Sequence, residues 1–244
     1  MFDTNIIPAA ERVYIINKLL EYGIKVDQIT GKISYIDGTS VPELKCASIH
    51  LIRHAETLAV TKREFMSDTS QNSVLTVDGI ESVEKQSQEL DSYNFDVALY
   101  GPVPRVIHTM EIIMSYPQKF EAFKLQKLHG IVNTGWEYKN IEEIKYNPIF
   151  IARELENNVF ARTPNGTSWG MVIANCVDVI DYINEKYADK RVLLISQGSV
   201  LRSLQILLRM RKHPWDDYAA KKMYHVGDDM SKKDYGLITK VFER

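Results

Sequence analysis

Arg53 and His54 are the residues of this sequence best suited to chemistry, because they follow directly on residues 49–52, which are apolar except for His50. Such a run predicts a buried strand, and ligands of open α/β sheets bind beyond the carboxyl ends of the strands. Arginine offers a permanent charge and a fork of donors that suits phosphate or carboxylate. Histidine can act as a neutral nucleophile or base near neutral pH. The pair alone would also fit a capped strand with two surface side chains.

Two further predicted strands also end in polar, turn-forming sequence. Residues 95–100 are followed by Gly-Pro-Val-Pro-Arg, which ends at Arg105, and residues 192–195 are followed by Ser-Gln-Gly-Ser, which contains Gln197. The carboxyl ends of parallel strands lie at one edge of a sheet, so the three polar segments are expected to meet there. This convergence favours a functional site over a capped surface strand.

Predicted helices alternate with the strands, which indicates a three-layer α/β/α fold around a mostly parallel sheet. Residues 192–195 are continuously apolar, as is typical of a strand covered on both faces. Residues 117–165 are rich in aromatic and turn-forming residues, and we interpret them as an irregular insertion over the sheet. The predicted helices span about residues 8–22, 76–90, 106–113, 169–187 and 200–210, and a final strand spans 235–242.

Residues 1–46 are predicted to form an N-terminal extension, and residues 47–244 the main domain. In the extension, helix 8–22 precedes a small hairpin formed by residues 24–26 and 33–36. No candidate catalytic group lies in this segment. We expect it to pack on the main domain, or to contact a protein partner or a second copy of the chain.

The composition excludes several classes of function. The formal net charge of −2 gives no basic field that would attract nucleic acid or an acidic membrane. No apolar run approaches the roughly 20 residues needed to span a bilayer, and the N-terminus lacks a signal-peptide pattern. Cys46 and Cys176 form no disulfide framework, and neither 213–217 nor 227–229 has metal-ligand spacing. We therefore expect a cytoplasmic protein without a metal or cofactor.

Five motifs in order resemble those of the histidine phosphatase superfamily, whose members have the phosphoglycerate mutase-like fold. The first is Arg-His-Ala-Glu-Thr at residues 53–57, which is similar to the family's Arg-His-Gly-Glu-Thr/Ser. The similarity extends from about residue 48 to the end of the chain and excludes the extension. The other motifs are Leu-Thr-Val-Asp-Gly, Gly-Pro-Val-Pro-Arg-Val-Ile-His-Thr, Pro-Asn-Gly-Thr-Ser and Ser-Gln-Gly, at residues 75–79, 101–109, 164–168 and 196–198.

The resemblance implies a role for each matching residue. His54 would be the nucleophile that carries a transient phosphohistidine, and Arg53 and Arg105 would clamp the phosphoryl oxygens. Thr57 would donate a further hydrogen bond near the phosphate. Gln197, followed by Gly198, occupies the position of the family's second histidine and is expected to bind a phosphoryl oxygen through its amide.

Several positions depart from the family pattern. The glycine after the Arg-His pair is Ala55, an expected asparagine is Val60, and the second histidine is Gln197. The family's acidic residue, which lies four residues before the Gly-x-Trp-Glu turn, aligns with Gly130 if residues 134–137 form that turn. A missing general acid typically costs about 10²–10⁴ in rate. The candidate replacement acids are Glu56, His129, Glu137 and Glu154.

These observations lead to two hypotheses of different class. The first is a phosphoric monoester hydrolase or phosphotransferase that acts on a small phosphorylated metabolite, such as a sugar phosphate, through a phosphohistidine on His54, with weak or altered activity. The alternative is a catalytically inactive pseudophosphatase that holds an anion between Arg53 and Arg105 while residues 1–46 engage a partner.

Overall fold

A mostly parallel sheet forms the centre of the protein. The computed structural model describes residues 7–66, 68, 70–210 and 238–243. In these residues the main sheet has the strand order β5-β4-β6-β3-β7, and only β7 runs antiparallel to its neighbour β3. The strands are β3 (Ser48–Arg53), β4 (Val97–Tyr100), β5 (Glu121–Lys124), β6 (Arg191–Ser196) and β7 (Ile238–Glu243).

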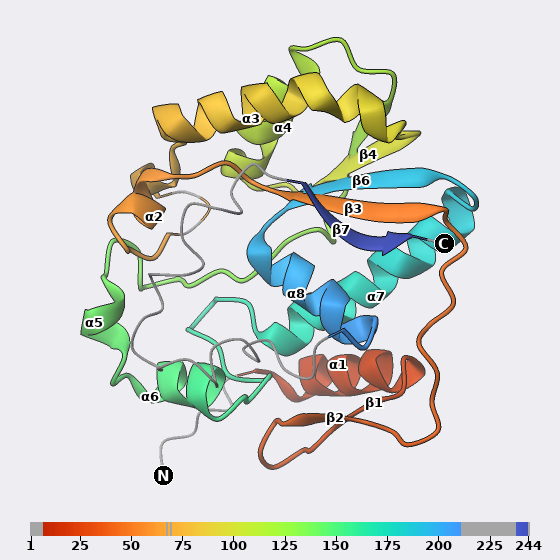
Figure 1. The fold of residues 1–244 in the computed structure, drawn as a ribbon. Helices are drawn as coiled ribbons and strands as arrows, with labels where there is room; N and C mark the ends of the chain where they lie inside the picture. The colour runs from red at the N-terminus through yellow and green to blue at the C-terminus, as the bar shows by residue number, and fades with distance from the viewer. Residues whose placement is uncertain (1–6, 67, 69, 211–237, 244) are drawn as a thin grey trace.

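Helices cover both faces of this sheet, as predicted from the continuously apolar strand at residues 192–195 (Figure 1). Successive side chains of a strand point to opposite faces. Leu193 and Ile195 of β6 therefore pack in the hydrophobic cluster of α3 and α4, whereas Val192 and Leu194 pack in the cluster of α7 and α8. These helices are α3 (Val77–Glu89), α4 (Pro104–Met114), α7 (Trp169–Lys186) and α8 (Gly198–Leu207).

Local sequence explains where two of these helices begin. The Thr76 hydroxyl accepts a hydrogen bond from the backbone N–H of Gly79 (3.0 Å), and the Ser168 hydroxyl accepts one from that of Met171 (3.2 Å). Such caps satisfy N–H groups that have no partner within the helix. None of the described helices is long and apolar enough to cross a membrane.

The prediction that residues 117–165 are wholly irregular is wrong. Residues Glu121–Lys124 form β5, which pairs with β4 at the edge of the sheet. Its sequence, Glu-Ala-Phe-Lys, has two charges and little apolar pattern because an edge strand buries little of its surface. The segment also contains α5 (Ile141–Ile144), α6 (Pro148–Phe150) and the π-helical turn η3 (Ile151–Leu155).

Smaller elements and boundaries also differ from the prediction. The predicted helix 200–210 is α8, which begins at Gly198 and ends at Leu207. The predicted final strand begins at Ile238 among the described residues, and 235–237 lie outside them, as do segments 213–217 and 227–229. The polar loop after β3 contains α2 (Leu58–Thr61) and η1 (Gln71–Ser73), and η2 (Leu90–Tyr93) follows α3.

The predicted N-terminal helix and hairpin are present and pack against the rest of the protein. Helix α1 (Ala9–Glu21) precedes β1 (Ile24–Val26) and β2 (Ile33–Tyr35), which pair antiparallel. Ile15, Leu19 and Ile24 are fully buried in the same hydrophobic cluster as β3, α7 and α8. This segment therefore contributes to the core of the protein.

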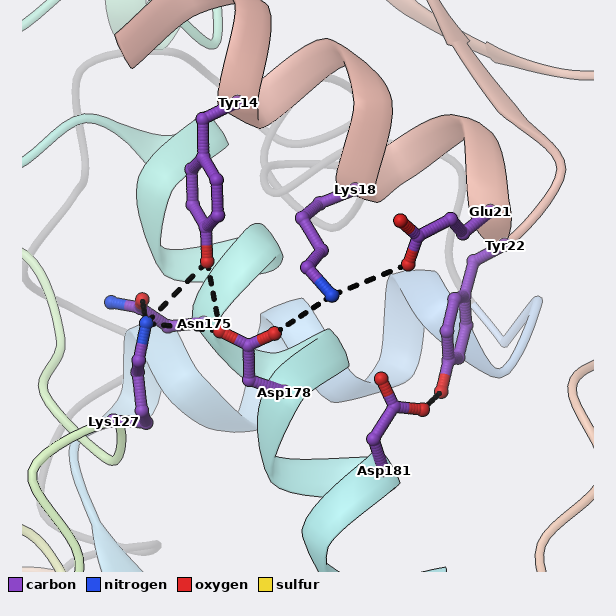
Figure 2. A network of polar contacts seen from close by, with 8 residues as sticks. All are labelled: Tyr14, Lys18, Glu21, Tyr22, Lys127, Asn175, Asp178 and Asp181. Atoms are coloured by element: carbon purple, nitrogen blue, oxygen red, sulfur yellow. Dashed lines mark hydrogen bonds and ion pairs between the residues drawn. The ribbon is translucent and has the colours of Figure 1, made fainter.

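Polar contacts join α1 to α7 around the carboxylate of Asp178 (Figure 2). Asp178 accepts a hydrogen bond from the Tyr14 hydroxyl (2.8 Å) and pairs with Nζ of Lys18 (3.0 Å) and Lys127 (2.9 Å). Burial raises the pKa of this carboxyl, but the bonds from the two lysines and the tyrosine outweigh burial and lower it. A second contact, from the Tyr22 hydroxyl to Asp181 (2.8 Å), lies further along the same helices.

We expect Asp178→Asn to lower the free energy of unfolding by about 1–3 kcal/mol at pH 7, because the amide loses the charge that holds three donors. A carboxyl whose pKa is lowered by folding stabilises the protein above its unfolded pKa of about 3.9, and that stabilisation is lost as the pH falls further. The difference between wild type and variant in urea denaturation should therefore shrink below about pH 4. Asp181→Asn, which keeps an oxygen that can accept the single hydrogen bond from Tyr22, is the matched control; an equal effect of both variants would contradict this account.

Candidate active site

The three polar strand ends meet at one edge of the sheet, as the sequence predicted. Arg53 at the end of β3 is in register with Ser196 at the end of β6, and the backbone N–H of His54 donates to the Ser196 carbonyl (2.9 Å). On the other side of β6, the N–H of Gly101 after β4 donates to the Ile195 carbonyl (3.0 Å). The β4-β6-β3 order therefore places the loops after these strands side by side.

A cavity of about 170 Å³ lies at this edge. Five residues that the sequence singled out line it, and seven others complete the lining. The five are Arg53, His54, Arg105, Gln197 and Gly198. The seven are Glu64, Phe65, Met66, Ile131, Asn133, Ser199 and Arg202.

His54 is buried and oriented by its own backbone neighbour. Its Nδ1 lies 2.8 Å from the Ala55 carbonyl oxygen, which can only accept, so Nδ1 carries the proton. Burial lowers the pKa of this imidazole well below its usual value, and the charges of Arg105 and Arg53 lower it further, against the effect of the Ala55 bond. The ring is therefore neutral near pH 7, with its lone pair on Nε2.

The two arginines reach the cavity from different elements. Arg53 ends β3, whereas Arg105 lies in the first turn of α4 and is only 4% exposed. Thr109, one turn further along α4, ties this helix to the histidine loop: its hydroxyl accepts from the Ala55 N–H (3.0 Å) and donates to the Arg105 carbonyl (2.7 Å). Two guanidinium groups at one cavity are suited to an anion with several oxygens, such as a phosphoryl group.

Asp68 and His129 form a charged pair beside Arg105. Sequence analysis named His129 as a candidate acid but did not identify Asp68. Oδ2 of Asp68 lies 2.8 Å from Nε2 of His129, and Oδ1 lies 3.6 Å from Nη1 of Arg105. The bond to Asp68 raises the pKa of His129, although burial opposes it. Burial alone would raise the pKa of Asp68, but the contacts with His129 and Arg105 have the larger effect, so the pKa is lowered. Arg105 is thus held next to a carboxylate.

Gln197 presents a side-chain amide to the cavity. Its side chain is 5% exposed, and its Nε2 is buried without a hydrogen-bond partner among the described residues. A phosphoryl oxygen in the cavity could accept from this N–H₂ group. The next residue, Gly198, allows Arg53 to lie close, because a Cβ there would be 3.2 Å from Nε of Arg53.

Thr57 does not reach the cavity directly. Thr57 is fully buried, and its hydroxyl donates to the Met66 sulfur (3.7 Å). Met66 itself lines the cavity. The role of Thr57 as a phosphate donor remains a prediction.

None of the four candidate acids named from the sequence lines the cavity in the described part of the chain. Glu56 accepts from the Thr76 hydroxyl (3.1 Å), Glu137 from the Gly135 N–H (2.7 Å), and Glu154 pairs with Arg153 (2.6 Å). The fourth, His129, is bonded to Asp68 as described above.

Gly130 lies against the side chains of Gln197 and Ser199, which a side chain at this position would have to displace. A Cβ at this position would be 2.7 Å from Oε1 of Gln197 and 2.3 Å from Oγ of Ser199. Real Cβ atoms essentially never come this close to another heavy atom. An acidic residue at position 130 would therefore require both neighbours to move.

Residues 64–66, Ser199 and Arg202 are further parts of the cavity that sequence analysis missed. Arg202 lies on the α8 turn after Gln197 and is buried. An arginine on the helix after the Ser-Gln-Gly motif is a sequence signal from which Arg202 could have been predicted. No comparable signal exists for Glu64, whose position depends on how its loop folds. Among the described residues, no group of three His, Cys, Asp or Glu side chains is placed to hold a metal ion.

Comparisons with known proteins agree with this geometry. Residues 49–222 match the family profile of the histidine phosphatase superfamily (branch 1). A search of curated proteins found no match.

Solved structures with the same fold cover about two thirds of the chain. Bacillus stearothermophilus YhfR is 21% identical, with a TM-score of 0.61 over 69% of this chain and 84% of that one. A putative alpha-ribazole-5'-P phosphatase from Escherichia coli is 20% identical (TM-score 0.57; 66% and 78% covered). A mycobacterial glucosyl-3-phosphoglycerate phosphatase is 14% identical (TM-score 0.57; 69% and 83% covered). The profile match covers most of the chain, and the chain belongs to the histidine phosphatase superfamily.

Proposed function

We propose that this protein is a phosphoric monoester hydrolase that transfers the phosphoryl group of a small phosphorylated metabolite to His54 and then to water. The observation that carries this proposal is the state of His54. A buried imidazole that is neutral, donates from Nδ1 and shares a cavity with two arginines has the properties of a phosphoryl acceptor.

The first step forms a bond between phosphorus and Nε2 of His54 and breaks the ester P–O bond. The leaving alcohol oxygen takes up a proton. Arg53 and Arg105 neutralise the charge on the phosphoryl oxygens during transfer, and the Gln197 amide donates a hydrogen bond to one of them. In the second step, water attacks the phosphohistidine, and inorganic phosphate leaves as His54 is regenerated.

The cavity and the structural relatives support a small substrate. A volume of about 170 Å³ accommodates a phosphoryl group with a modest organic part. By their names, relatives with the same fold act on alpha-ribazole-5'-phosphate and on glucosyl-3-phosphoglycerate, and another was solved in complex with phosphoserine. We therefore infer a small phosphate monoester, with sugar phosphates among the candidates.

A specific observation also favours the binding-protein alternative. By the resemblance, Gln197 stands at the position of the family's second histidine, and an acidic side chain at position 130 would have to displace Gln197 and Ser199. An inactive relative would use the same arginines to hold an anion without transferring it.

Phosphate release from an aryl phosphate and from a panel of sugar and other small phosphates separates these two functions. We expect release from the aryl phosphate and from at least one metabolite, and no release by a His54→Ala control. Binding of inorganic phosphate by calorimetry, with no release from any ester, would establish the binding protein and refute the hydrolase.

A further inference from the structure

The cavity needs a proton donor for the leaving oxygen, because an alkoxide is a poor leaving group. We propose that Glu64 is this general acid, supplied by the loop after α2 in place of a residue at position 130. The inference rests on the proposed hydrolase function and adds to it the residue that makes alkyl phosphates accessible substrates.

The lining of the cavity leaves few alternatives. Among its described residues, only His54 and Glu64 carry an imidazole or a carboxyl group. His54 is the nucleophile and cannot also protonate the leaving group on the far side of phosphorus. Gln197 has an amide that holds no transferable proton, and Gly130 has no side chain. Glu64 is therefore the described lining residue that can supply the proton.

The loop that carries Glu64 is fixed against the insertion. The Glu64 N–H donates to the Ala59 carbonyl (2.8 Å), and residue 64 forms a bridge with Asn140. The next residue, Phe65, donates its N–H to the Lys139 carbonyl (2.9 Å) and packs edge-on against Trp136, with 5.4 Å between ring centroids. These contacts fix the backbone of residues 64 and 65, which line the cavity.

The carboxyl group itself is also held. Nδ2 of Asn72 donates to Oε2 of Glu64 (3.2 Å) and to the Phe65 carbonyl (3.0 Å). An amide donor engages one carboxyl oxygen, so the other can carry the acidic proton. Glu64 is half-buried, which leaves a path for the proton to be replaced from solvent.

The proton of Glu64 is used in the first step and recovered in the second. As the bond between phosphorus and Nε2 forms, the ester P–O bond breaks and the leaving oxygen takes the Glu64 proton. In the second step, the Glu64 carboxylate takes a proton from the attacking water and returns to its starting state.

Glu64→Gln tests this role by the dependence on leaving group. For an alkyl phosphate we expect kcat to fall about 10²–10⁴-fold, the usual contribution of a general acid. For an aryl phosphate with an acidic phenol, which leaves without protonation, we expect a change of no more than a few fold. Glu142→Gln, at an exposed carboxylate of α5 that pairs with Lys145 and does not line the cavity, is the matched control.

The outcomes separate this inference from the proposed function. If wild type hydrolyses both esters and Glu64→Gln does so equally well, Glu64 is not the acid, while the hydrolase function stands. Equal losses on both esters in a folded variant, judged by circular dichroism, would also refute the acid role. If wild type hydrolyses neither ester, the hydrolase and the acid role are both wrong.

Discussion

Replacing His54 with alanine is expected to lower kcat for phosphate release on the order of 10⁴–10⁶-fold, the scale seen when a catalytic nucleophile is removed. The cavity would keep both arginines and the Gln197 amide, but nothing else in its described lining has an unprotonated nitrogen of comparable nucleophilicity. The measurement is steady-state release of phosphate from an aryl phosphate, with phosphate affinity determined in parallel.

His54→Asn provides a control for local structure. Its side-chain amide can still donate to the Ala55 carbonyl, as Nδ1 of His54 does. We expect this variant to bind phosphate and to be as inactive as the alanine variant. Activity that survives in either purified variant would show that His54 is not the nucleophile or that the activity belongs to a contaminant.

Arg105→Ala is expected to lower kcat/KM about 10²–10³-fold, the usual cost of one donor to a transition state. The substitution also leaves the Asp68 carboxylate at the cavity without its arginine, so the local field becomes less favourable to an anion. Because a guanidinium contacts two oxygens at once and an ammonium does not, Arg105→Lys should restore only part of this loss. The measurement is kcat and KM for an aryl phosphate.

Arg162→Ala is the matched control for Arg105→Ala. Arg162 is also largely buried and pairs with Glu11 (3.2 Å), but it does not line the cavity. We expect it to retain wild-type kinetic constants at a temperature where the protein is folded. A loss of kcat/KM of similar size in both variants would mean that the effect of Arg105 is one of stability.

The sequence was sufficient to predict a mostly parallel sheet and the meeting of three of its strand ends. Residues 192–195 are apolar at every position because β6 is covered on both faces, and the turn-forming residues after β3, β4 and β6 mark where those strands stop. Strand β5 was not predictable in this way. An exposed edge strand of four residues is held by its pairing with β4, and local sequence carries little record of that pairing.

The sequence predicted that His54, Arg53 and Arg105 come together, whereas it did not predict Glu64 and Asp68. Arg53, His54 and Arg105 directly follow strands or begin a helix, so their positions depend on regular elements. Glu64 and Asp68 belong to an irregular loop that reaches the cavity only because it pairs with residues 137–140. Contacts between segments so far apart in the chain leave no periodic pattern in the sequence.

Docking of the N-terminal segment depends on similar long-range contacts. Tyr14 and Asp178 are separated by 164 positions, and neither residue alone indicates a partner. The sequence predicted the helix and the hairpin, but it could not decide between packing on the main domain and contact with another protein. The shared hydrophobic cluster and the Asp178 contacts show that the segment packs on the main domain (Figure 2).

The most direct test of the account is to locate the phosphoryl group during turnover. Wild type is mixed with a radiolabelled aryl phosphate or sugar phosphate, quenched in alkali, where a P–N bond survives, and analysed by peptide mass spectrometry. The account predicts a phosphoryl group on His54 that is labile to acid and absent from His54→Asn. Phosphate release without label on His54, or with label on another residue, would contradict it.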